Sequence, residues 1–304
     1  MSSQKTVLIL GVSGQVGREL QRSFADAGEL ICCDRRQVDF ANPEQLRNVV
    51  REAAPDVILN AAAYTAVDRA ESDGDAAMAV NAQAPRILAE EARRRAALFV
   101  HYSTDYVFDG SKNGPRIETD PTGPLNVYGA SKLTGEQAIA EVGGKYLILR
   151  TSWVYGPHGK NFLLTMLRLG AERERLTIVD DQTGSPTTSM AIADATRVIV
   201  DRVLDAPEKD WAGIYHMTCA GSTTWCGFAR EIFAQAGSLL AGVPEVIPIA
   251  SSKYPTPATR PRNSILSNEK LAARFSVRLP TWETALDSVL TKLRVDSSAG
   301  SLNR

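Results

Sequence analysis

KTVLILGVSGQVG, residues 5–17, joins a short apolar run to glycines spaced three residues apart. The apolar run predicts a buried strand, and residues 15–27 predict the helix that follows it. Gly11, Gly14 and Gly17 therefore lie at a strand–turn–helix junction. Glycines there let the backbone turn tightly and approach a pyrophosphate, whose charge the helix N-terminus favours. The stretch predicts a dinucleotide-binding loop.

The alternation of strand and helix continues along the first half of the chain. Further apolar runs predict strands at residues 29–34, 56–63, 97–104 and 145–153. Helices are predicted at residues 43–53, at about 76–95 and from near Tyr128. Strands this continuously apolar are buried on both faces, which is typical of a parallel sheet covered by helices on either side. We therefore expect a doubly wound, Rossmann-like α/β fold.

After Trp153 the pattern loosens, and this change predicts a boundary between two parts. We expect residues 1–152 to form the dinucleotide-binding domain and residues 153–304 to form mainly a smaller C-terminal substrate-binding lobe. Some segments within about 176–219 are expected to return to the sheet. The chain should end in a helix and a polar tail, and such tails are usually disordered.

Composition limits the classes of partner. The 304 residues carry 34 basic and 35 acidic side chains, a formal charge of −1, so no global field favours nucleic acid or an anionic membrane. No signal sequence and no apolar run of roughly 18 residues occurs, which predicts a cytoplasmic protein without a membrane partner. The four cysteines and three histidines lack metal-ligand spacing, so we expect no metal.

The acidic residue after the second predicted strand bears on the choice of cofactor. Asp34 lies 20 residues beyond Gly14, where a carboxylate accepts hydrogen bonds from an adenosine ribose, and this favours NADH. Arg35 and Arg36 follow at once, and a guanidinium there can pair with the 2′-phosphate of NADPH. A solvated turn is the alternative for the two arginines. We expect either NADPH or NADH to serve as cofactor.

The stretch VYGASK, residues 127–132, supplies candidate catalytic groups. Tyr128 and Lys132 are four residues apart, so on a helix they share one face. A nearby ammonium lowers the pKa of a phenol and makes it a better proton donor. Ser103 and Thr104 end the fourth predicted strand, at the sheet edge where α/β proteins bind ligands. The alternatives are a surface pair covering apolar area and hydroxyls that only close a turn.

These motifs together resemble the extended short-chain dehydrogenase/reductase family. Within that family, further stretches of the chain resemble the dTDP-4-dehydrorhamnose reductases in order and spacing: NAAAYTAVDRAE, STDYVFDG, VYGASKLTGE, RTSWVYG, GKNF, DQTGSPT and TRPRNS. The resemblance implies reduction, by NADPH or NADH, of the 4-keto group of a dTDP-linked 6-deoxyhexose to give dTDP-L-rhamnose. It also implies a nucleotide-sugar substrate. A homodimer is the candidate assembly.

The resemblance also implies roles for individual residues. Tyr128 would be the proton donor, Lys132 its partner and cofactor anchor, and Thr104 a group that tunes the phenol and touches the sugar. The cofactor would contact Gly11, Gly14, Gln15, Val16, Asp34, Arg35, Asp39, Phe40, Ala63, Tyr64, Thr65, Tyr102, Tyr128 and Lys132. The nucleotide-sugar would contact Thr104, Asp105, Trp153 and Arg260, with Arg262 a second candidate partner for the diphosphate. Many relatives are expected to have histidine in place of Tyr64.

Neighbouring activities remain as alternatives. A 4,6-dehydratase would need an acidic pair directly after the strand-end threonine, but Thr104 is followed by Asp105 and Tyr106. Reduction of another dTDP-4-keto-6-deoxyhexose stays open. A non-catalytic reading also stays open, because the same lineage resembles an NADP-binding regulatory subunit of a methionine adenosyltransferase. Turnover of a keto-sugar distinguishes the enzyme from such a subunit.

Overall fold

The main sheet is parallel throughout. The computed structural model describes residues 5–301, with side chains described through residue 296. Within this range the strands of the sheet are β1 (Thr6–Leu10), β2 (Glu29–Cys33), β3 (Val57–Asn60), β4 (Leu98–Thr104), β5 (Tyr146–Thr151) and β10 (Gly213–His216). Their order is β10-β5-β4-β3-β1-β2. The chain steps outward from β1 in both directions, so the topological switch point lies between β1 and β3.

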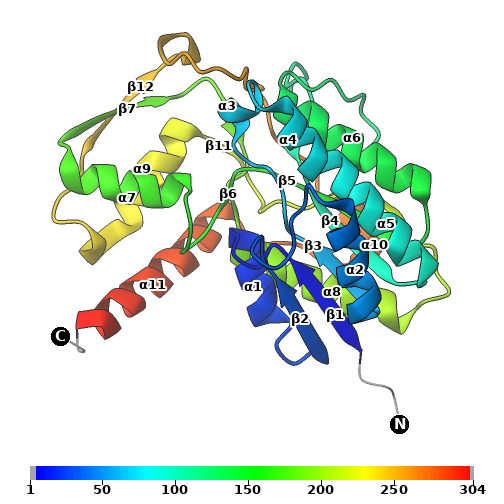
Figure 1. Ribbon diagram of the computed structural model, residues 1–304. Helices are drawn as coiled ribbons and strands as arrows, with labels where there is room; N and C mark the ends of the chain where they lie inside the picture. Colours follow the sequence, from blue (N-terminus) through cyan, green and yellow to red (C-terminus); the bar gives the residue numbers. More distant parts are fainter. Residues whose placement is uncertain (1–4, 302–304) are drawn as a thin grey trace.

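Helices cover both faces of this sheet (Figure 1). On one face lie α1 (Gln15–Ser23) and α8 (Ser189–Asp205), and on the other lie α2 (Pro43–Ala53), α5 (Ala84–Arg94) and α6 (Val127–Val142). Val7 and Ile9 belong to the first core, whereas Leu8 and Leu10 belong to the second. Successive residues of a strand point to opposite faces, so burial on both sides requires the unbroken apolar runs seen in the sequence. The predicted doubly wound fold is confirmed.

The helical segment predicted at about 76–95 is not one regular helix. It consists of α4 (Gly74–Met78), a π-helical turn η1 (Ala79–Gln83) and α5, and a short helix α3 (Val67–Ala70) precedes it. Pro85 at the start of α5 has no amide hydrogen to bond to the preceding turn, which accounts for the wider turn at this point. The turn buries Asn81, whose side chain then holds the loop after β3.

The second half of the chain forms most of a smaller lobe. Its elements are β6 (Val154–Tyr155), α7 (Phe162–Glu172), β7 (Arg175–Val179), β8 (Thr183–Gly184), β9 (Thr187–Thr188), β11 (Thr223–Thr224), α9 (Trp225–Ala236), β12 (Glu245–Ile249) and α11 (Trp282–Ser301). Helix α10 (Glu269–Phe275) packs instead on β10, at the edge of the main sheet. Short 3-10 turns occur at η2 (Asp105–Val107), η3 (Gly237–Leu239) and η4 (Ser251–Lys253). In Figure 1, α7, α9, β7 and β12 lie together beside the main sheet.

The small strands of this lobe pair with one another and not with the main sheet: β12 with β7, β11 with β8, and β6 with β9. Of the segment 176–219, the strand β10 pairs with β5 and α8 packs on α1, so these parts belong with the larger body. We infer two parts that meet near residue 152, with β10 and α8 returning to the first part.

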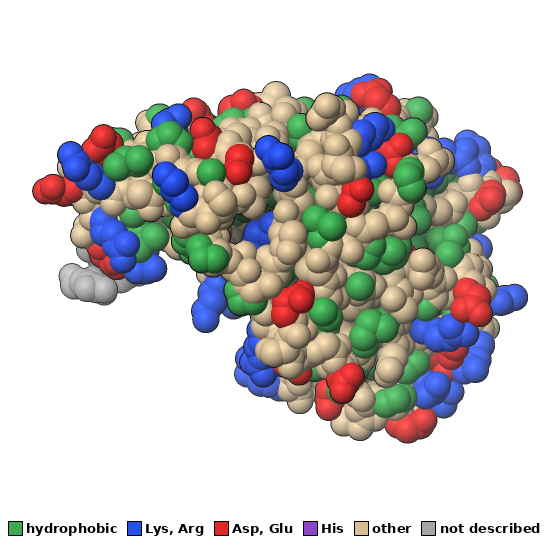
Figure 2. Space-filling view, turned by 90° about the horizontal axis from the view of Figure 1, so that it is seen from above, with side chains coloured by type: hydrophobic (Ala, Val, Ile, Leu, Met, Phe, Trp, Pro, Cys, Tyr) green, Lys and Arg blue, Asp and Glu red, His purple; other side chains and the backbone are tan. Residues whose placement is uncertain are grey.

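The remaining features concern the chain end and the surface. Helix α11 extends to Ser301, through most of the tail that was predicted to be disordered, and residues 302–304 lie outside the described range. Among the described residues, no helix combines the length and apolar character needed to cross a membrane. Figure 2 shows basic and acidic side chains intermingled over one face of the molecule, in keeping with the balanced charge.

Candidate active site

The glycine loop after β1 has the geometry of a pyrophosphate cradle. Gly11 has φ +85°, and a Cβ there would meet the Ala62 backbone nitrogen at 2.6 Å. Gly14 caps α1, and its amide donates to the Gly11 carbonyl at 3.0 Å. A Cβ on Gly17 would lie 2.2 Å from the same carbonyl oxygen. The loop therefore packs backbone against backbone and places the α1 N-terminus at the switch point, which fits an anionic dinucleotide.

Gly17→Ala should damage this loop. The new methyl group would collide with the Gly11 carbonyl oxygen, which belongs to the backbone and has little room to move. We expect a loss of about 1–3 kcal/mol in the free energy of unfolding and weaker cofactor binding. Thermal unfolding and fluorescence titration with NADPH measure the two effects. Gly242→Ala is the control, because a Cβ at Gly242 meets no atom within 4 Å. Equal thermal stability and equal NADPH affinity of the two variants would contradict this packing.

At the end of β2, Asp34 and Arg36 form a pair. The Asp34 carboxylate accepts from the Arg36 backbone amide at 2.8 Å and from Arg36 Nε at 2.9 Å. The hydrogen bonds from Arg36 hold the pKa of Asp34 below its ordinary value. Asp34 is buried, whereas the guanidinium of Arg36 remains exposed. Asp34, the candidate ribose ligand, and Arg36, a candidate partner of the 2′-phosphate, thus lie together. Arg35 beside them is exposed.

The other predicted cofactor residues lie on several loops. The Asp39 carboxylate accepts from the Ala41 amide, and Phe40 is buried in the core beside α2. Thr65 is exposed. Tyr64 donates its hydroxyl to Asp73 at 3.0 Å. The Asn81 side chain accepts a hydrogen bond from the Tyr64 amide and donates one to the Tyr64 carbonyl oxygen, and these two bonds fix the conformation of the loop after β3.

Two of the predicted cofactor residues contact parts of the chain distant in sequence. Gln15 accepts a hydrogen bond from Asn161 at 2.8 Å, so the glycine loop touches the segment that leads into α7. Val16 and Ala63 are partly buried. Tyr102 is buried with its hydroxyl 2.9 Å from Thr196 Oγ1, on the α8 side of the sheet, and burial raises its pKa.

Thr104, Asp105 and Tyr128 come together at the carboxyl end of β4. Thr104 Oγ1 donates to Asp105 Oδ1 at 3.1 Å and accepts from the Tyr106 amide at 3.2 Å. Tyr128 lies in the first turn of α6, and its ring meets the Tyr106 ring edge-on at 5.7 Å between centroids. Burial raises the pKa of Tyr128 to about 12, and a hydrogen bond with Thr104 opposes that shift. Burial likewise raises the pKa of Asp105 to about 7.

Lys132 points into the protein and not into solvent. Its side chain is only 1% exposed, and its Nζ lies 3.0 Å from His101 Nε2 and 2.7 Å from the Tyr102 carbonyl oxygen. Burial lowers the pKa of Lys132 to about 8. The prediction that Lys132 lowers the pKa of the Tyr128 phenol is wrong for this structure, because Lys132 Nζ contacts β4 and burial raises the pKa of the phenol. The phenol consequently stays protonated near neutral pH, which is the form a proton donor needs.

On the lobe side, Trp153 has an unusual conformation. Its φ is +47°, a left-handed value that is costly for a bulky residue. The indole stacks on Trp225 with ring centroids 3.5 Å apart, and a Cβ on Gly184 would lie 2.4 Å from it. The ring is therefore clamped between α9 and β8. This placement keeps Trp153 a candidate wall for the sugar or base.

Arg260 is already paired in this structure. Its two terminal nitrogens bind the Asp68 carboxylate at 3.0 and 2.7 Å. The pair joins the loop before α10 to α3, and Asn126 at the start of α6 adds a hydrogen bond to the Thr259 carbonyl. A diphosphate would have to share the guanidinium with Asp68. Arg262 is exposed on the same loop.

Sequence reasoning missed several residues of this region. Asn60 and His101 are fully buried beside Lys132 and hydrogen-bonded to each other. Asn60 opens the stretch NAAAYTAVDRAE, but neither residue was assigned a role from the sequence. Alternation along β4 could have indicated His101, since it must face away from Tyr102 and toward α6. Trp225, Gly184 and Asp68 act across long sequence separations, for which a single sequence gives no signal.

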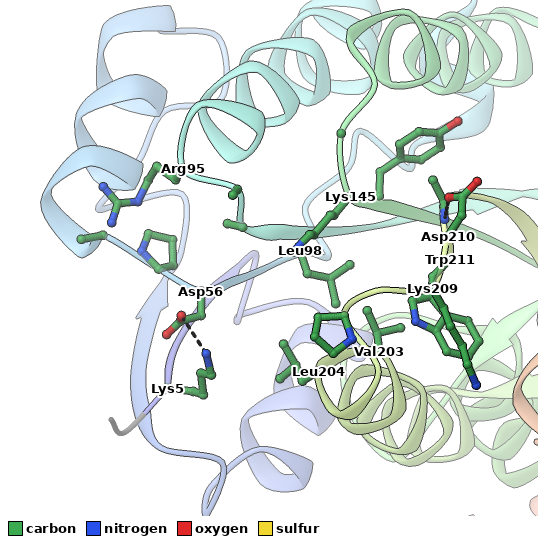
Figure 3. Close-up of a pocket in the computed structure, with 18 residues that line it drawn as sticks. Lys5, Asp56, Arg95, Leu98, Lys145, Val203, Leu204, Lys209, Asp210 and Trp211 are labelled. Atoms are coloured by element: carbon green, nitrogen blue, oxygen red, sulfur yellow. Dashed lines mark hydrogen bonds and ion pairs between the residues drawn. The ribbon is translucent and has the colours of Figure 1, made fainter. Parts of the chain in front are cut away.

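A cavity of about 290 Å³ lies elsewhere, where the strands of the main sheet begin (Figure 3). It is lined by residues such as Lys5, Asp56, Leu98, Lys145 and Trp211, and Lys5 pairs with Asp56 at 3.2 Å. The catalytic candidates lie at the ends of the strands, so this cavity is separate from them.

In the part of the chain that the structure describes, no group of three or more His, Cys, Asp or Glu side chains is arranged to hold a metal ion.

Comparison with known proteins agrees with this arrangement. A family model described as the RmlD substrate binding domain matches residues 5–295. A dTDP-4-dehydrorhamnose reductase from Burkholderia thailandensis is 52% identical, over 92% of this chain and 96% of that protein. One from Escherichia coli K12 is 45% identical, over 94% of this chain and 97% of that protein.

Solved structures give the same result. The crystal structure of a dTDP-4-dehydrorhamnose reductase from Bacillus anthracis in complex with NADP has a TM-score of 0.88 and 36% identity, covering 95% of this chain and 99% of that one. A Thermus thermophilus UDP-glucose 4-epimerase at 22% identity, with a TM-score of 0.73, shares the fold. Sequence, fold and site thus agree, and the chain belongs to the family described by the RmlD substrate binding domain.

Proposed function

We propose that this protein is a dTDP-4-dehydrorhamnose reductase, which reduces the C4 keto group of dTDP-4-dehydro-6-deoxy-L-mannose to give dTDP-L-rhamnose. The name rests on the relatives that match almost the whole chain. The observation that supports catalysis is the meeting of Thr104 and Tyr128 at the carboxyl edge of the sheet, the edge at which the glycine loop also lies. An oxidoreductase of this kind needs a proton donor at that edge.

The residues of the chain divide the work of the reaction. When bound, the reduced nicotinamide supplies the hydride that reaches C4. Tyr128 donates its proton to O4 as negative charge develops there, so the carbonyl becomes a hydroxyl and Tyr128 is left as phenolate until it regains a proton. Thr104 lies beside the phenol, and it would stabilise that phenolate once its hydroxyl hydrogen turns from Asp105 Oδ1 to the phenolate oxygen. Asp105 fixes Thr104 through its Oδ1.

Binding of the two substrates involves different parts of the molecule. Gly11, Gly14 and the α1 N-terminus would hold the pyrophosphate of the cofactor, and Asp34 with Arg36 would hold the adenosine ribose. The smaller lobe would hold the nucleotide-sugar, with Trp153 providing a flat apolar wall. The Bacillus anthracis relative binds NADP, which supports NADPH as a cofactor here, and Asp34 supports NADH.

Arg36→Ala should change the cofactor preference. Asp34 holds the Arg36 guanidinium at the end of β2, where a 2′-phosphate would be met. Because the guanidinium is largely exposed, we expect kcat/KM for NADPH to fall by about tenfold and kcat/KM for NADH to change little. Steady-state kinetics with each cofactor measure the ratio. Arg35→Ala tests the neighbouring arginine in the same way. An unchanged ratio in Arg36→Ala would remove Arg36 from phosphate recognition.

The direct test of the function supplies purified protein with the dTDP-linked keto-sugar and either NADPH or NADH. Loss of nicotinamide absorbance and formation of dTDP-L-rhamnose, identified by NMR, are the expected results. A different reduced sugar would contradict the substrate while keeping the reductase class. Absence of any turnover with a folded, cofactor-binding protein would favour the non-catalytic regulatory reading.

A further inference from the structure

A buried chain of hydrogen bonds joins Lys132 to strand β3. Asn60 Nδ2 lies 3.1 Å from His101 Nδ1, and His101 Nε2 lies 3.0 Å from Lys132 Nζ. Asn60 and His101 are fully buried, and Lys132 is almost so. Every polar hydrogen in such a network needs an acceptor, because water cannot reach it.

The orientation of the Asn60 amide fixes the proton positions. The Ala62 backbone amide donates to Asn60 Oδ1 at 3.2 Å, so the amide oxygen faces Ala62 and the NH₂ group faces His101. His101 Nδ1 must then accept a hydrogen bond. Burial holds the pKa of His101 well below its usual range, so the ring is neutral. A neutral imidazole that accepts at Nδ1 carries its proton at Nε2.

The proton on His101 Nε2 points at Lys132 Nζ. An uncharged amine satisfies this geometry, since its lone pair accepts from Nε2 and one of its hydrogens goes to the Tyr102 carbonyl at 2.7 Å. A charged ammonium has no lone pair, so it would force the His101 proton to Nδ1, against the NH₂ of Asn60. Rotating the Asn60 side-chain amide by half a turn would place its NH₂ group against the Ala62 backbone N–H, so two donors would still face each other. The network therefore accommodates the uncharged lysine.

The surroundings of Lys132 support this assignment. Glu136 on the same helix favours the charged form, but its carboxylate is already paired with Arg150 of β5 at 2.9 and 2.6 Å. From η2, Asp105 acts on Tyr128, and the groups of β4 that touch the amine are the neutral His101 ring and the uncharged Tyr102 carbonyl. Burial lowers the pKa of Lys132 to about 8, against the opposing effect of Glu136.

We propose that His101 is a positioning residue that, at alkaline pH, holds Lys132 as an uncharged amine while the cofactor site is empty, and that cofactor binding then converts it to the ammonium with uptake of one proton from solvent. The proposal rests on the proposed function, since it takes Lys132 to be the group that meets the cofactor. His101 itself touches neither substrate. Its role is to set the charge of Lys132 before and after binding.

Calorimetric titration in buffers of different ionisation enthalpy counts the protons taken up on binding. For a lysine with a pKa of about 8 that becomes fully charged when bound, we expect roughly 0.9 proton per NADH or NADPH at about pH 9. At about pH 6.5 uptake with NADH should be close to zero, because the lysine is already charged. NADH at the lower pH avoids titration of the 2′-phosphate of NADPH.

Two variants test the network from different atoms. In His101→Gln the side-chain oxygen can accept from an ammonium, and in Asn60→Asp the carboxylate accepts from Nδ1 and frees Nε2 to accept. Each should leave Lys132 charged in the free protein, so proton uptake at about pH 9 should fall below roughly 0.2. If His101 and Asn60 only stabilised the fold, the folded variants would bind the cofactor and still take up a proton. If one variant fails to fold, the other gives the same readout.

The outcomes separate the two claims. Cofactor binding without proton uptake by the unsubstituted protein would overturn the inference and leave the reductase assignment intact. Uptake that persists undiminished in the folded variants would also overturn it, since another group would then supply the signal. Failure of both NADH and NADPH to bind would overturn the inference and the proposed function together.

Discussion

Tyr128→Phe should reduce turnover of the dTDP-linked keto-sugar by a factor on the order of 10²–10⁴, the usual contribution of a positioned general acid. The variant keeps the ring that packs edge-on against Tyr106 and removes only the hydroxyl beside Thr104. Because the glycine loop and Asp34 are untouched, the Kd for NADPH should be nearly unchanged. Single-turnover kinetics and fluorescence titration measure the two quantities separately.

Tyr106→Phe is the matched control for this prediction. It removes a phenolic hydroxyl from the neighbouring ring, 5.7 Å away between centroids, and we expect a much smaller loss of turnover. The reversed result, a large loss for Tyr106→Phe and near-normal turnover for Tyr128→Phe, would make Tyr106 the acid. Since the pKa of Tyr128 is about 12, its deprotonation should not limit activity near neutral pH.

Arg150→Met should destabilise the protein by about 3–5 kcal/mol, because it leaves the Glu136 carboxylate buried without its countercharge. Arg150 and Glu136 are both at most 2% exposed, and they form a bidentate pair between β5 and α6. Arg150 also lies over the Phe108 ring at 5.0 Å. Urea-induced unfolding measures the change in the free energy of unfolding.

Two further variants show whether the buried charge is the cause. Arg150→Met combined with Glu136→Leu removes both charges, and we expect it to recover much of the loss. Arg168→Met breaks an exposed pair with Glu172 on α7 and should change stability by less than about 0.5 kcal/mol. A double variant as unstable as Arg150→Met alone would show that packing, and not the unpaired carboxylate, is responsible.

The fold was largely predictable from the sequence, for a physical reason. A strand buried on both faces must be apolar at every position, so KTVLIL and DVILN could hardly be anything other than central strands. The glycine positions were equally informative, because the close approach of Gly17 to Gly11 excludes a side chain. Such constraints are local, and local constraints are visible in a single sequence.

The site was predictable only as a set of residues. The spacing of Tyr128 and Lys132 correctly places them one helical turn apart, but spacing does not reveal the partner each side chain takes. Lys132 turns to His101, and Arg260 turns to Asp68, 192 residues away in sequence. The left-handed Trp153 depends on Trp225 and Gly184 in the same way. Contacts that form only in the folded chain were beyond the sequence.

The most direct test of the central claim is the fate of the transferred hydrogen. Purified protein would convert the dTDP-linked keto-sugar with NADPH carrying deuterium at C4 of the nicotinamide, and NMR would locate the label in the product. We predict dTDP-L-rhamnose with deuterium at C4 of the sugar, and much slower formation by Tyr128→Phe. Deuterium at another carbon, or an unreduced sugar, would contradict the account.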